Sequence, residues 1–183
     1  MGKRSSFERV PRDFYPTPPE AVVPLLTHVP QRARYIEPCA GDGVLTVHLD
    51  RRGLTCVGAY DIEPQMPVAG CDQLIVAKDA TEYEYPGAFS ADYFITNPPW
   101  DRKVLHPIIT NLSRQAPTWL LFDADWMHTR QSAPFMPLLR KVVSVGRVKW
   151  IPDSPFTGKD NCCWYLFDAA TDAPAEFIGR LAA

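Results

Sequence analysis

The sequence predicts an α/β protein whose mostly parallel, doubly wound sheet contains one antiparallel strand. Short apolar segments alternate with helix-compatible segments along most of the chain, as in a parallel sheet covered by helices. Residues 118–123 are apolar nearly throughout, which is typical of a strand buried on both faces. Two further apolar segments follow without a helix between them, which indicates an antiparallel pair.

The N-terminal half is expected to contain two helices and three strands. The first helix begins with Pro18, Pro19 and Glu20, which suit a first helical turn, although Pro24 lies inside it. The second helix follows a glycine turn and ends at Gly53, a common position for a terminal glycine. The helices are expected over 18–28 and 44–52, and the strands over 35–37, 55–60 and 73–77.

The C-terminal half is expected to contain four strands and two helices. Apolar spacing favours a helix after the fourth strand, and another before the antiparallel pair in spite of Pro134 and Pro137. The strands are expected over 92–96, 118–123, 142–151 and 162–168, and the helices over 103–114 and 133–141.

Length and composition favour a single cytoplasmic domain over residues 1–183, with residues 1–19 as an N-terminal arm. No apolar run approaches the roughly 20 residues that span a membrane, and the polar, basic N-terminus has no apolar signal core. The five cysteines lack a C-x-x-C pair and are expected to be reduced. The four histidines show no ligand spacing, so no metal site is expected.

The segment Asn97-Pro98-Pro99-Trp100 directly follows an apolar strand. Two prolines fix φ twice and remove two backbone donors, which makes a rigid group of acceptors from the Asn97 side-chain oxygen and the Pro98 carbonyl. Trp100 adds an aromatic face. This combination suits a planar group that carries an exocyclic NH2, because the acceptors take its hydrogens while the indole stacks on it.

A second motif lies upstream, where residues 35–45 indicate a short strand, a glycine turn and the start of a helix. Gly41 and Gly43 permit backbone conformations and a close ligand approach that a side chain would block. The segment lacks the full G-x-G-x-x-G spacing of dinucleotide sites and the Lys-Ser/Thr of phosphate loops.

Together these motifs resemble class I S-adenosylmethionine-dependent methyltransferases, most of all the small, phage-type adenine-N6 DNA methyltransferases. Five family segments match in order: the Phe/Tyr-x-Thr-Pro segment, the Gly-x-Gly loop, the acidic residues after the second and third strands, and the Asp/Asn-Pro-Pro-aromatic motif. The matching positions here are 14–18, 37–43, Asp61, Asp79 and 97–100. The resemblance implies a Rossmann-like sheet of seven strands in the order 3-2-1-4-5-7-6.

The resemblance implies S-adenosylmethionine as cofactor, held at the carboxyl ends of the strands. Asp61 would accept from the ribose hydroxyls, Ile62 would lie against the adenine, and Asp79 would accept from the adenine amine. Glu37 would support the loop or face the ammonium group. The other positions assigned to the cofactor are Tyr15 and Thr17 at its methionine carboxylate, and Cys39, Gly41, Gly43 and Asn97.

The resemblance also implies a catalytic motif of Asn97, Pro98, Pro99 and Trp100 acting on the N6 amine of adenine in DNA. The base must be flipped out or single-stranded to reach them. Trp100 would stack on the base, and Phe156 and Lys159, in one loop, are assigned to substrate binding.

The distribution of charged residues along the chain is compatible with DNA binding. The net charge is −2, but residues 1–12 hold four basic and one acidic residue, and residues 126–160 hold six basic and two acidic ones. Such basic regions suit a phosphate backbone that crosses the catalytic edge. Trp126 and Trp150 interleave with the second region, or belong to the core.

Three alternatives stay open at this point. The motif also occurs in methyltransferases that act on ribosomal RNA bases and on glutamine amides of proteins, and all these targets carry a planar NH2 group. A methyltransferase fold retained only for binding is the third. The chain also leaves little length for target recognition, so either specificity is loose or a homodimer or partner supplies it.

Overall fold

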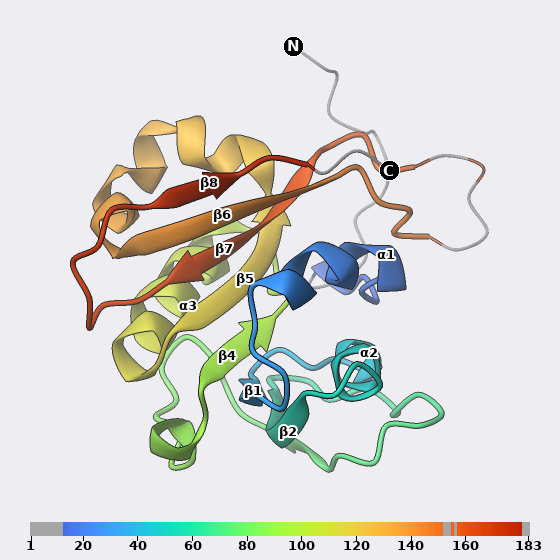
Figure 1. Ribbon diagram of the computed structural model, residues 1–183. Coiled ribbons are helices and arrows are strands. Elements are labelled where there is room, and N and C mark those ends of the chain that lie inside the picture. The colour runs from blue at the N-terminus through green and yellow to red at the C-terminus, as the bar shows by residue number, and fades with distance from the viewer. Residues whose placement is uncertain (1–12, 152–154, 156, 181–183) are drawn as a thin grey trace.

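A computed structural model of the chain describes residues 13–151, 155 and 157–180. One mixed sheet has eight strands, and helices cover both of its faces (Figure 1). The strands are β1 (Arg34–Glu37), β2 (Thr55–Asp61), β3 (Ile75–Ala77), β4 (Tyr93–Thr96), β5 (Thr118–Asp123), β6 (Leu139–Gly146), β7 (Cys162–Phe167) and β8 (Glu176–Ile178). The α-helices are α1 (Pro19–Val22), α2 (Val44–Asp50) and α3 (Arg102–Gln115). The 3-10 helices are η2 (Val23–Thr27), η3 (Ala88–Ser90), η4 (Ala124–His128) and η5 (Arg130–Leu138).

The sheet order is β3-β2-β1-β4-β5-β7-β6-β8. Strand β7 is antiparallel to both β5 and β6, and the other neighbouring strands are parallel. The expected α/β class, the order of the first seven strands and the one antiparallel strand are therefore confirmed. Strand β1 lies between β2 and β4, so the order reverses there, where ligands bind in sheets of this type.

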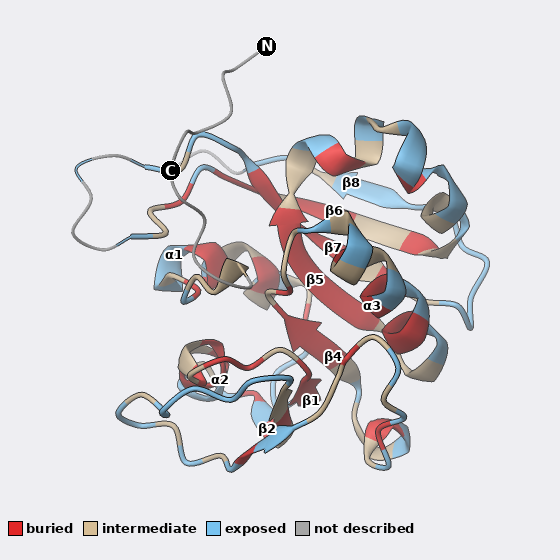
Figure 2. Ribbon diagram, turned by 180° about the vertical axis from the view of Figure 1, so that it is seen from behind, coloured by how far each residue is buried: buried red, intermediate tan, exposed pale blue. Residues whose placement is uncertain are grey.

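Alternate residues of the central strands point to two separate cores. One core joins α1 and α2 to the sheet through Trp119, Leu121 and Trp164. The other joins α3 to the opposite face through Leu120, Phe122 and their neighbours. Figure 2 shows this burial concentrated along the central strands. Both faces are covered, which explains why β5 is apolar between its two end residues.

Two expected helices differ from the structure. The segment 18–28 is divided into α1 and η2, because Pro24 lies in the first turn of η2 and has no N–H for a longer α-helix. The expected helix over 133–141 is wrong. A 3-10 segment containing Pro134 and Pro137 ends at Leu138, and residues 139–141 already belong to β6.

The eighth strand was not expected. Strand β8 pairs in parallel with β6, and Lys141 forms an ion pair with Glu176 at 2.9 Å. Strand β8 has only three residues, and none of them is fully buried. The strand therefore lacks the alternation of apolar and polar residues by which strands are recognised in a sequence. Within the described residues, no helix is long and apolar enough to cross a membrane.

Candidate active site

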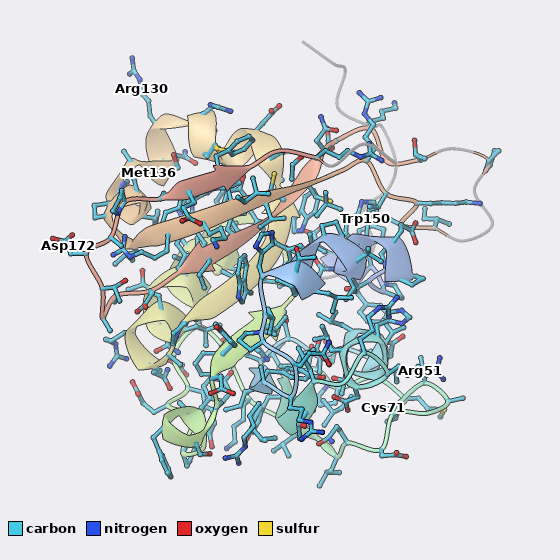
Figure 3. The ribbon with its side chains drawn as sticks, viewed as in Figure 1. Arg51, Cys71, Arg130, Met136, Trp150 and Asp172 are labelled. Carbon is cyan, nitrogen blue, oxygen red and sulfur yellow. The ribbon has the colours of Figure 1, made fainter. Side chains whose placement is uncertain are left out.

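The glycine turn after β1 is held in a shape that requires both of its glycines. Gly41 and Gly43 have φ of 56° and 78°, a region that side chains disfavour. A Cβ on Gly43 would overlap the Cys71 thiol, and one on Gly41 would overlap the ring of Phe14. Cys71, which is labelled in Figure 3, therefore lies at the start of α2. The turn is thus closely covered on two sides.

Glu37 ends β1 and is only 1% exposed. The Thr46 hydroxyl of α2 donates a hydrogen bond to its carboxylate. Burial raises the pKa of Glu37 well above its usual value, and the nearby Asp42 and Asp61 raise it further. Of the two roles expected for Glu37, the geometry favours support of the loop, because the side chain binds β1 to α2.

Asp61 ends β2 and organises the loops on either side of it. One carboxylate oxygen accepts from the Gly41 N–H at 2.8 Å, and the other accepts from the Glu63 N–H at 2.8 Å. Ile62, the next residue, is 52% exposed. An acceptor therefore lies next to an exposed apolar side chain at the carboxyl end of β2.

Asp79 follows β3 and begins a turn. Its carboxylate accepts from the Thr81 N–H at 2.8 Å and the Thr81 hydroxyl at 2.7 Å. Tyr85 is a nearby residue that no sequence pattern singles out. Its hydroxyl is buried and has no hydrogen-bond partner among the described residues. Burial raises the pKa of Tyr85, and the nearby Cys39 and Asp79 add to that increase.

Asn97 directly follows β4 and is half-buried. Its amide nitrogen donates to the Tyr15 carbonyl and to the Thr17 hydroxyl, each at 3.2 Å. Its amide oxygen accepts from the Trp100 indole N–H at 3.4 Å, and that N–H also donates to the Leu121 carbonyl at 3.2 Å. The side chains at both ends of the tetrapeptide are therefore fixed by defined partners.

The elements on this edge are joined to one another. The Ala40 N–H donates to the Tyr60 carbonyl at 2.8 Å, which ties the glycine turn to β2. The Thr96 hydroxyl donates to the Cys39 carbonyl at 3.4 Å, which ties β4 to the same turn. Burial raises the pKa of the Cys39 thiol, so this cysteine remains a neutral part of the turn.

A groove of about 290 Å³ lies next to the tetrapeptide. Its lining includes Thr17, His48, Lys149 and Trp150. The Trp150 ring meets Trp100 edge to face, with centroids 5.6 Å apart. Figure 3 shows Trp150 on the side of the molecule where α1 lies. Two sequence signals bear on this groove, namely the family segment that contains Thr17 and the alternation of tryptophans with basic residues.

The other expected site residues differ in what can be said of them. Lys159 is exposed in the loop before β7, and Phe156 falls outside the described residues. Trp126 belongs to the core, where its indole N–H donates to His106 at 3.1 Å. Among the residues that the structure describes, no group of three His, Cys, Asp or Glu side chains could hold a metal.

The chemistry available at this edge is that of acceptors beside apolar surfaces. Asp61 ends β2, Asp79 follows β3 and Asn97 follows β4, and because these strands are parallel the three residues share the carboxyl edge of the sheet. Such an edge suits a ligand rich in N–H and O–H donors and carrying a flat ring.

No protein-family model matches the sequence, and no curated protein matches it. The structure is similar to that of a candidate RNA methyltransferase from Pyrococcus horikoshii, with a TM-score of 0.61 and 14% identity over 89% of this chain and 91% of that one. It is also similar to a candidate class I S-adenosylmethionine-dependent methyltransferase from Listeria monocytogenes. That TM-score is 0.60, at 10% identity over 95% of this chain and 67% of the other.

A modification subunit of a candidate type I restriction enzyme from Vibrio vulnificus is a third similar structure. Its TM-score is 0.54, with 14% identity over 93% of this chain and 47% of that one, so this chain spans about half of that subunit. Similarity at such low identity shows a shared fold. The chain therefore has the Rossmann-like fold of class I methyltransferases, as the sequence predicted.

Proposed function

We propose that the protein transfers a methyl group from S-adenosylmethionine to the exocyclic N6 amine of an adenine in DNA. The observation that carries this proposal is that residues 14–17 join the glycine turn to the tetrapeptide. Phe14 lies on Gly41, and the Asn97 amide is bound by Tyr15 and Thr17. A methyl donor bound at the turn and an amine bound at Asn97 would thus be neighbours.

The acceptor-rich edge fits S-adenosylmethionine, whose ribose hydroxyls, adenine amine and ammonium group are all donors. Each Asp61 oxygen accepts one backbone N–H, which leaves lone pairs for the ribose hydroxyls. Ile62 offers apolar surface to the adenine, and the Asp79 carboxylate offers an acceptor to its amine. When bound, S-adenosylmethionine supplies a methyl group that its sulfonium makes electrophilic.

The amine of adenine is a weak nucleophile because its lone pair is delocalised into the ring. In this proposal the Asn97 oxygen and the Pro98 carbonyl accept its two hydrogens and orient that lone pair. Trp100 stacks on the base, a contact worth about 1–3 kcal/mol in comparable cases. Positioning and electrostatics then supply most of the acceleration, and the chain needs no strong general base.

Two observations favour DNA as the substrate. A restriction-enzyme modification subunit is among the similar structures. In addition, Lys149 lines the groove beside Trp150, where a phosphate backbone could pass. An RNA base is the second candidate, because the candidate RNA methyltransferase matches the chain over 91% of its own length.

The test incubates the purified protein with S-adenosylmethionine and either DNA or ribosomal RNA, and measures N6-methyladenine in the digests by mass spectrometry. We expect N6-methyladenine in DNA with the wild-type protein and none with Asn97→Ala. Methylation of RNA alone would replace DNA by the second candidate. Methylation of neither nucleic acid, with glutamine peptides also unmodified, would overturn the proposal.

A protein that kept the methyltransferase fold only for binding would also show no methylation, so a second measurement is needed to recognise it. Calorimetry with S-adenosylmethionine separates the two cases, because the intact glycine turn and Asp61 predict that the cofactor binds. A folded protein that binds no cofactor would support the non-catalytic alternative.

A further inference from the structure

The Asn97 side chain can adopt only one orientation without losing hydrogen bonds. A primary amide has two N–H donors and one oxygen acceptor. Both donors are used, on the Tyr15 carbonyl and the Thr17 hydroxyl. A rotation by 180° would set the amide oxygen against the Tyr15 carbonyl oxygen, and the amide NH2 against the Trp100 N–H. Both new contacts would be repulsive.

We propose that the Tyr15 carbonyl and the Thr17 hydroxyl act as an amide clamp, which holds the Asn97 oxygen toward the target amine. The inference rests on the proposed function, since it names a positioning residue for that reaction. The Asn97 oxygen has two lone pairs and gives one to the Trp100 N–H, so one remains for a substrate hydrogen. Thr17 thereby acts on the amine through Asn97.

The amide clamp is rigid. Thr17 is only 4% exposed, and the residues on either side of it are Pro16 and Pro18. Each proline fixes its own φ and keeps the preceding residue extended, so Tyr15 and Thr17 are both restricted. Phe14 on Gly41 fixes the start of the segment, and Pro18 begins the turn that leads into α1. The Asn97 amide is therefore held by a segment with little freedom to move.

The Thr17 hydroxyl accepts from Asn97 and keeps its own hydrogen for donation. The contact with the cofactor carboxylate that the family resemblance implies would use that hydrogen, so the two roles are compatible. The two roles of Thr17, as a cofactor contact and as part of the amide clamp, predict different kinetic effects when the hydroxyl is removed. Loss of a cofactor contact alone raises the KM for the cofactor, whereas loss of the amide clamp lowers kcat at saturating cofactor.

The decisive variant is Thr17→Val, which keeps the shape of the side chain and removes its hydroxyl. We expect kcat to fall about tenfold at saturating cofactor, the effect of one hydrogen bond lost from an oriented group. Thr17→Ser, which keeps the hydroxyl, should recover most of the loss. The matched control is Thr118→Val, because Thr118 is also buried and its hydroxyl donates to the Ala116 carbonyl at 2.8 Å. Thr118 is the first residue of β5 and so lies at the end of that strand away from the candidate site. It should leave kcat unchanged.

A spectroscopic measurement keeps the test independent of activity. In proton–nitrogen spectra, the Asn97 side-chain NH2 is assigned from its loss in Asn97→Ala, and the Trp100 indole N–H from its loss in Trp100→Phe. Thr17→Val should shift both signals, and Thr118→Val should shift neither.

The outcomes separate the two proposals. If wild-type protein methylates DNA while Thr17→Val changes only the KM for the cofactor, the amide clamp is wrong and the proposed function stands. If the wild type methylates nothing, the proposed function is wrong, and the spectra alone decide on the clamp. Unchanged Asn97 and Trp100 signals in Thr17→Val would overturn it in either case.

Discussion

Asn97 and Asp61 lie on the same edge of the sheet but have different partners, so their substitutions should separate two steps. Asn97→Ala removes the acceptor for the target amine and leaves the Asp61 contacts with Gly41 and Glu63 intact. We expect a loss of methyl transfer of about 100-fold or more, with cofactor affinity changed only a few-fold. Single-turnover rates and calorimetry measure the two quantities. A parallel loss of both would contradict this division of roles.

Asp61→Asn should act mainly on the cofactor. An amide has one oxygen, so only one of the two backbone N–H groups keeps its acceptor, and the new NH2 faces the other donor. The loop is loosened and fewer lone pairs remain for the ribose. We expect the Kd for S-adenosylmethionine to rise about tenfold or more, measured by calorimetry. An unchanged Kd would show that the ribose binds elsewhere.

Tyr85 offers a test of a residue that sequence patterns do not reveal. Its hydroxyl makes no hydrogen bond within the described residues, so Tyr85→Phe removes an unsatisfied polar atom. The free energy of unfolding of the free protein should change by less than about 0.5 kcal/mol or increase slightly. The affinity for S-adenosylmethionine should change little, because the hydroxyl is enclosed in the core and not exposed to a ligand. A several-fold loss of affinity in Tyr85→Phe would contradict this and show that the hydroxyl reaches the bound cofactor.

At the scale of elements, Glu37 joins β1 to α2 through Thr46, and its raised pKa makes this junction sensitive to pH. A carboxyl whose folded pKa is raised binds its proton more tightly in the folded state. Its stabilising contribution is complete below the unfolded pKa of about 4.3, and it is lost as pH rises through the folded pKa.

Glu37→Gln removes this titration and keeps an oxygen that can accept from Thr46. We expect the variant to gain stability relative to wild type as the pH is raised from 5 to 8, by about 1.4 kcal/mol for each pKa unit of the shift traversed. Urea denaturation at several pH values measures this difference. A constant difference across that range would show that Glu37 titrates normally.

The elements that the sequence predicted well are those with a strong local signal. Strand β5 matches its expected bounds because burial on both faces makes it apolar nearly throughout, and α3 has an apolar face on Leu105, Ile108 and Leu112. The α-helix expected over 133–141 was wrong, because Pro134 and Pro137 overrule the apolar spacing and the chain forms the 3-10 helix η5 instead. Strand β8 was not recognised in the sequence, because it forms only through its pairing with β6.

The candidate site follows the same division. The residues at the strand ends could be found because Gly41, Asp61 and Asn97 occupy positions that the topology defines. The partners of Asn97 could not, since Tyr15 and Thr17 are some 80 residues away in the chain. The unpartnered Tyr85 hydroxyl is a property of packing, and sequence spacing does not express it.

For the whole molecule, the central question is which positive charges are available to a nucleic acid. The chain has a net charge of −2, so binding must depend on local regions. Lys141 is paired with Glu176, and Arg140 is bonded to Thr171 and to backbone carbonyls. The charge of Lys141 is therefore balanced locally, and the Arg140 donors already have partners, so these two residues are less able to bind a phosphate. Lys149 differs, because it lines the groove beside Trp150.

Lys149→Gln should accordingly weaken DNA binding in a way that depends on salt. Each phosphate contact contributes roughly 0.9 to the slope of log K against log salt concentration, so losing one should lower that slope by about 1. The matched control is Arg130→Gln, because Arg130 belongs to the same basic region but lies far from Trp150 (Figure 3). Fluorescence anisotropy with a labelled duplex over a range of salt concentrations gives both slopes. Equal slopes for the two variants would mean that the backbone does not follow the groove. A reduced slope for Arg130→Gln alone would move the DNA path to the surface around η5.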